Sequence, residues 1–70
     1  MVNDIFYLEQ LQRAAEALKQ AVEERNAAGL ALAMARDAAT RAREARRHEG
    51  LHRKTEELKQ RLLDVAARRG

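Results

Sequence analysis

No apolar side chain larger than alanine occurs between Ala35 and Gly50. This segment consists mostly of alanine, arginine and acidic residues, a composition that favours helix. At 100° per residue, one side of the predicted helix is basic and the opposite side is a flat alanine stripe, formed by Ala31, Ala35, Ala38, Ala42 and Ala45. A stripe of small residues lets a second helix approach closely. The sequence therefore predicts a fold of packed helices that meet through small side chains.

The size of the chain limits how large a core it can bury. It has 70 residues, at most one small domain, and alanine supplies 15 of its apolar residues. It contains no cysteine, so disulfide bonds cannot compensate for a small core. Small chains without disulfides or metals usually gain stability by association. We therefore expect a single domain, residues 1–70, that is oligomeric.

The residue types present exclude several chemistries. The sequence has neither serine nor cysteine, so it offers no candidate for either nucleophile, and we expect no enzyme activity and no cofactor. No apolar run approaches the roughly 18 residues that span a bilayer, and the first residues lack a signal-peptide pattern. We therefore expect a cytoplasmic protein without a membrane partner. Abundant alanine, with more arginine than lysine, suggests a bacterial or phage origin.

The first predicted helix, about residues 4–26, carries the clearest apolar pattern. Asn3 or Asp4 is a candidate N-terminal cap, with Val2 placed to pack against Tyr7. Apolar residues then recur at alternating spacings of three and four, as in a coiled coil. The larger ones are the predicted interface with a partner or a second copy: Leu8, Leu11, Leu18 and Val22.

Two glycines make the number of helices ambiguous. The stripe is interrupted near Gly29, where residues 26–29 form either a turn or a change of phase within one long helix. Gly50 follows a basic stretch, which is typical of a helix C-terminus, so we predict a turn there between helices at about 29–48 and 51–69. The possible ion pair between Glu49 and Arg53 would span that turn and favours continuity instead.

Folding back at Gly50 would pack large side chains against small ones. In this antiparallel hairpin Leu58 and Leu62 approach the levels of Ala42 and Ala38, and Val65 approaches Met34. The predicted class is an all-α helical hairpin with a long first helix and coiled-coil-like packing. Three helices and one continuous coiled coil are the alternatives. Each arrangement leaves a leucine stripe for a partner to cover.

The middle of the chain holds most of the positive charge. Residues 36–54 have seven basic and three acidic side chains, a net charge of +4. Candidate phosphate contacts lie on one face of the predicted helix: Arg36, Arg43, Arg47 and Lys54. Nucleic acid is therefore a possible partner.

The segment from His48 to His52 matches the H-E-x-x-H pattern of zinc proteases. A catalytic zinc site also needs a third ligand and a substrate cleft. Arg47 and Arg53 flank the pattern with positive charge that opposes metal binding. We therefore predict no metal site.

These observations favour a non-enzymatic helical interaction module that acts through leucine and alanine helix faces, as an oligomerisation domain, adaptor, assembly factor, co-chaperone or inhibitor. The alternative is a small basic protein that binds nucleic acid or regulates transcription through the arginine face of residues 36–54.

Overall fold

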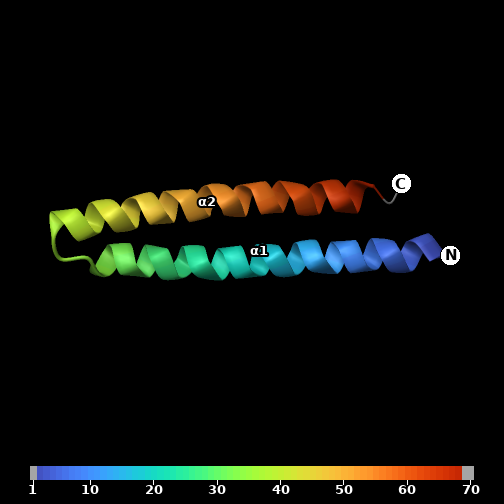
Figure 1. Ribbon diagram of the computed structural model, residues 1–70, viewed down its shortest axis with the longest axis horizontal. Helices are drawn as coiled ribbons and strands as arrows, with labels where there is room; N and C mark the ends of the chain where they lie inside the picture. Colours follow the sequence, from blue (N-terminus) through green and yellow to red (C-terminus); the bar gives the residue numbers. More distant parts are fainter. Residues whose placement is uncertain (1, 69–70) are drawn as a thin grey trace.

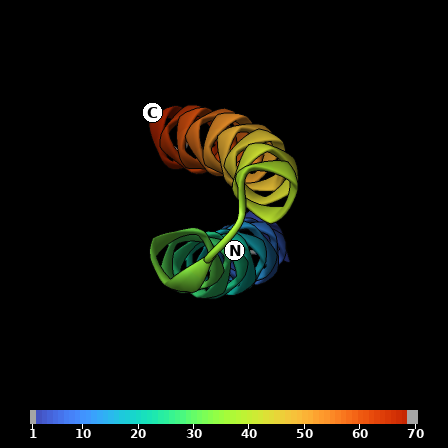
Figure 2. The ribbon, with the colours of Figure 1, turned by 90° about the vertical axis from the view of Figure 1, so that its left-hand side faces the viewer.

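The fold is a pair of long antiparallel helices. The computed structural model describes residues 2–68, and the side chains of residues 5–68. In that part of the chain, α1 (Val2–Met34) and α2 (Ala38–Ala67) lie side by side, joined by residues 35–37 (Figure 1). The Cα atoms extend over 57 × 14 × 11 Å. Viewed from the turn, the helices cross at a shallow angle (Figure 2). The predicted all-α hairpin is confirmed, and residues 2–68 form two helices rather than three.

The chain reverses at residues 35–37 because Asp37 caps α2. Asp37 has extended backbone angles (φ −120°, ψ 160°), and its Oδ1 accepts a hydrogen bond of 2.8 Å from the Thr40 amide. The Thr40 hydroxyl donates to Asp37 Oδ2 at 2.9 Å. These bonds satisfy an amide at the start of α2 that would otherwise lack a partner. Asp37 therefore begins the second helix.

The same turn closes the end of α1. The Ala35 amide donates to the Leu32 carbonyl at 3.2 Å, and Arg41 Nη2 donates to the Ala35 carbonyl at 3.3 Å. Arg41 thus places a cationic donor at the carboxyl end of α1, where positive charge is favourable. The hydrogen bond from the Thr40 amide, the Thr40 hydroxyl and the nearby Arg43 all lower the pKa of Asp37. The turn is therefore held by side chains of residues 37–41 without a glycine or proline.

The helices meet along a line of alanines on α1. Ala14, Ala21 and Ala28 recur every seven residues and are 8%, 2% and 0% exposed. On α2 the buried side chains are Thr55 and Val65. The Thr55 hydroxyl donates a hydrogen bond to the Leu51 carbonyl at 2.8 Å, so this buried polar group has a partner. Among the described residues no side chain larger than valine is buried, so the hairpin core consists of small residues.

Two contacts establish the antiparallel register. A Cβ atom added to Gly29 would lie 3.4 Å from His48 Cδ2, so these residues are opposite each other near the turn. At the open end, the Tyr7 hydroxyl donates to the Ala66 carbonyl at 3.3 Å. Between these points Ala21 lies level with Thr55. The alanines of α1 therefore face the leucine-, threonine- and valine-bearing side of α2.

The predicted turn at Gly50 is wrong, and so is the helix boundary at 48–51. At residues 26–29, where a turn and one continuous helix were the alternatives, the helix is continuous. Both Gly29 and Gly50 lie inside helices, and no glycine among the described residues has a positive φ. Glu49 and Arg53 form the ion pair across Gly50, with Nη2 and Oε1 3.7 Å apart. Helical glycine costs only about 1 kcal/mol relative to alanine, which a long helix pair tolerates. The predicted capping by Asn3 or Asp4 and packing of Val2 lie outside the described side chains.

The predicted packing of residues 30–48 against 51–69 is wrong as well. Ala38 and Ala42 lie on the same helix as Leu58 and Leu62, so they cannot face them across a hairpin. Both alanines are exposed, and Met34 is 70% exposed at the end of α1. Leu58, Leu62 and Val65 lie toward α1 instead. Leu58 and Leu62 are half-buried there, and Val65 is buried. Large residues do meet small ones, but the small partners are on α1.

Replacing Gly50 with alanine is expected to stabilise the hairpin. A Cβ atom at this position has no neighbour within 4 Å, so the variant should gain about 1 kcal/mol of helix propensity. The melting temperature followed by circular dichroism should rise by about 4–8 °C. Gly29→Ala is the matched control and should gain less, because its Cβ atom would contact the His48 ring. A lower melting temperature for Gly50→Ala would contradict a continuous α2.

Candidate functional site

An apolar groove runs along one side of the hairpin. It has a volume of about 460 Å³ and is lined by Ala15, Leu18, Lys19, Val22 and Glu23 of α1 and by Leu62 of α2. Four of its six lining residues are apolar, and the two charged ones, Lys19 and Glu23, come from α1. The groove holds no buried polar side chain that would orient a small molecule. Its chemistry suits the apolar side chains of another helix.

The predicted interface residues lie on this side of α1. Leu8 is 58% exposed, whereas Leu11, Leu18 and Val22 are half-buried. Their spacing of three and four places them in one stripe beside the buried alanines. Leu18 and Val22 line the groove itself. The stripe is therefore shared between the hairpin interface and the surface.

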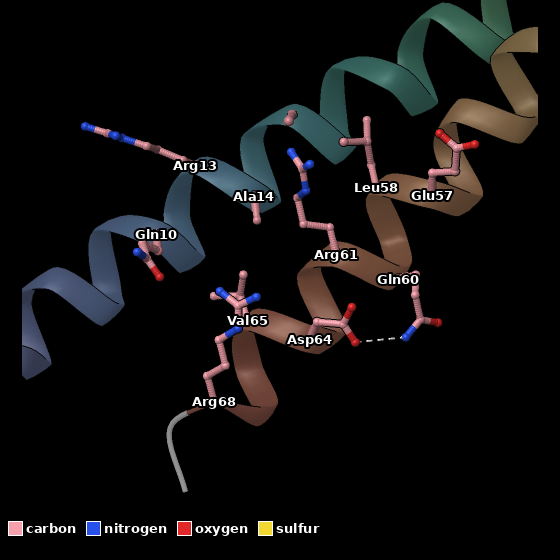
Figure 3. A pocket seen from close by; sticks show the side chains of 11 residues that line it. Gln10, Arg13, Ala14, Glu57, Leu58, Gln60, Arg61, Asp64, Val65 and Arg68 are labelled. Atoms are coloured by element: carbon pink, nitrogen blue, oxygen red, sulfur yellow. Dashed lines mark hydrogen bonds between the residues drawn. The ribbon is translucent and has the colours of Figure 1, made fainter.

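The groove on the other side of the buried alanines is charged. It has a volume of about 650 Å³, and its lining includes Gln10, Arg13, Glu57, Arg61 and Asp64. In Figure 3, Arg61 points from α2 toward α1, whereas Arg13 points away from the groove. Gln60 Nε2 donates to Asp64 Oδ1 at 3.1 Å. The two long sides of the hairpin thus differ, one being apolar and the other carrying charges of both signs.

The candidate phosphate contacts are all exposed and extend from the turn to the middle of α2: Arg36, Arg43, Arg47 and Lys54. Arg36 is in the turn, and the other three are on α2. Arg47 is paired with Glu44, with Nη1 and Oε2 3.5 Å apart. Their spacing of four and seven residues on α2 keeps Arg43, Arg47 and Lys54 on one side of that helix.

His48 and His52 are both inside α2, where His48 is half-buried against Gly29 and His52 is exposed. Within residues 2–68, no group of three or more histidine, cysteine, aspartate or glutamate side chains is placed to hold a metal ion. Neither described helix contains a stretch that is apolar and long enough to cross a bilayer.

The hairpin exposes more surface than a compact protein of its mass. Its accessible area is 5701 Å² at 8.0 kDa, whereas a compact folded monomer of this mass exposes about 4,500 Å². The excess includes large apolar side chains that are more than half exposed: Ile5, Phe6, Leu8, Leu30, Met34 and Leu63. The elongated shape of the hairpin, 57 × 14 × 11 Å, accounts for this excess, because two helices cover each other on one side only.

Sequence reasoning missed the residues that determine this geometry. Asp37 is an N-cap residue within an alanine and arginine segment, and Thr40 three positions later gives it a local partner. The seven-residue spacing of Ala14, Ala21 and Ala28 also marks a helix interface. Both signals are present in the sequence, but the turn was predicted from the two glycines instead.

Comparison of the chain with protein-family models, curated proteins and solved structures finds no match.

Proposed function

We propose that this chain is a non-enzymatic helical interaction module that associates with another helix pair through its apolar groove. The observation that carries the proposal is the groove between Leu18, Val22 and Leu62, where the hairpin leaves leucine and valine side chains only half-buried. Burying such side chains is worth about 1.5–3 kcal/mol each. Association through the groove would therefore supply stabilisation that the small-residue core of the hairpin lacks.

The composition of the hairpin core supports the same proposal. Ala14, Ala21 and Ala28 bury little apolar area compared with leucine or phenylalanine. Two-helix hairpins of this size rarely supply enough burial to be stable alone. A second pair of helices over the groove would complete a four-helix core, and such bundles are built from hairpins like this one.

Phosphate binding by the basic face of α2 is a second candidate function. It is favoured by one observation, the exposed row of Arg43, Arg47 and Lys54 on α2. Binding of this kind would be electrostatic and would weaken steeply with salt. It would use the basic face of α2 rather than the groove, whose lining includes none of these three residues.

One titration tests both candidates. The chain has no cysteine, so Glu56→Cys, at an exposed position on α2, accepts a single fluorophore. The fluorescence anisotropy of this labelled chain should rise when unlabelled chain is added and should stay constant with duplex DNA at about 50 mM salt. A response to DNA alone, lost at high salt and in the Arg43→Glu, Arg47→Glu double variant, would replace the first candidate with the second.

A further inference from the structure

Charge is distributed unequally along the rod. The half nearest the turn, residues 24–54, has eight basic and four acidic side chains, a net charge of +4. The described remainder, residues 2–23 and 55–68, has five basic and seven acidic side chains, a net charge of −2. The rod is 57 Å long, and charges are screened over about 8 Å at physiological salt. The two halves therefore act as separate charged surfaces.

This polarity distinguishes the two ways in which a second copy could lie along the groove. A parallel copy would place the two basic halves together and the two acidic halves together, which is unfavourable. An antiparallel copy with its axis near Ala15 places the two basic halves at opposite ends of the dimer, where each turn projects past the partner. Repulsion between the basic halves thus favours an antiparallel second copy over a parallel one.

The apolar stripe of α1 also has nearly the same spacing on either side of Ala15, toward the N-terminus and toward the C-terminus. Leu8 and Val22 each lie seven residues from Ala15, and Leu11 and Leu18 lie four and three residues from it. When the stripe is reversed about Ala15, leucine or valine again meets leucine or valine. The small side chain of Ala15 permits the close approach that a two-fold axis at that point requires. Ala15 itself is exposed and lines the groove.

We propose that the groove is covered by an antiparallel second copy of this chain, related by a two-fold axis near Ala15, which gives a four-helix bundle. This inference rests on the proposed function and specifies its partner and geometry. In the dimer, Leu8 of the second copy lies level with Val22, and Leu11 of the second copy lies level with Leu18 and Lys19.

Disulfide trapping in the full chain tests this geometry, since the native sequence has no cysteine to interfere. Across an axis near Ala15, two Ala15→Cys residues come within the Cα separation of about 4–7 Å that a disulfide needs. Two Asn26→Cys residues would be about 33 Å apart in the antiparallel dimer, at 1.5 Å per residue, but adjacent in a parallel one. Asn26 is exposed, so its substitution leaves the hairpin core intact. The mass of each reduced variant is measured by light scattering alongside.

We expect Ala15→Cys to form a covalent dimer under mild oxidation and Asn26→Cys to stay uncrosslinked, while both reduced variants have twice the 8.0 kDa chain mass. Crosslinking of both variants would indicate a parallel dimer. Association without either crosslink would place the interface elsewhere. Each of these two results overturns the antiparallel geometry but leaves self-association standing. A helical monomer that forms no crosslink would overturn both the geometry and the proposed function.

Discussion

Replacing Ala28 with leucine is expected to destabilise the hairpin strongly. Ala28 is fully buried between the helices, one residue before the close approach of Gly29 to His48. Three additional carbon atoms at this point must separate the helices or force His48 from its position. Overpacking of this kind typically costs about 1–3 kcal/mol. The melting temperature followed by circular dichroism should fall by roughly 5–20 °C.

Ala27→Leu is the matched control for this prediction. Ala27 is the preceding residue on α1, is exposed, and receives the same substitution. Because alanine and leucine both have high helix propensity, the control should change the melting temperature little. If Ala28→Leu were as stable as Ala27→Leu, the helices would not be held together by close contact at the alanines.

The helical content and the hairpin class follow from local signals, but the position of the turn does not. Helix-favouring residues and three–four spacing predict helices over nearly the whole chain. Glycine is a weak helix terminator because its cost of about 1 kcal/mol is small beside the packing of a long helix pair. Asp37 ends one helix run and begins another because its carboxylate supplies a hydrogen bond to Thr40. The position of the turn is therefore determined by the Asp37 cap. The lack of a side chain at Gly50 is not enough to end a helix.

Which alanines are buried between the helices could not be predicted from local signals either. Two alanine series in the sequence could admit a close neighbouring helix, one including Ala38 and Ala42, the other formed by Ala14, Ala21 and Ala28. Which series is buried depends on where the chain reverses. With the turn at residues 35–37, the second series faces α2, whereas Ala38 and Ala42 of the first are exposed. The apolar stripe that contains Leu18 is local to one helix, and its use by a partner remains a proposal.

The second large effect is expected from Leu18→Asp in the apolar groove. Each copy in a symmetric dimer would lose one leucine from the interface, and because Leu18 is already half-buried, the loss is about half of the roughly 1.5–3 kcal/mol for full burial. Placing a carboxylate there adds the cost of removing its charge from water. Association should weaken at least about a hundredfold, since 1.4 kcal/mol corresponds to a factor of ten.

Leu30→Asp makes the same change at a position on α1 that is 63% exposed and outside the groove lining. The affinity of self-association of this variant should equal that of the unchanged chain. Circular dichroism on both variants shows whether the helices remain formed. If Leu30→Asp dissociated the protein as strongly as Leu18→Asp, the interface would not be the groove.

Light scattering on the unchanged chain and the Leu18→Asp variant, at equal concentration, tests most directly whether association covers the groove. We expect a multiple of the 8.0 kDa chain mass for the unchanged protein and a smaller mass for the variant. A mass of 8.0 kDa for the unchanged protein at every concentration, together with full helicity, would contradict it.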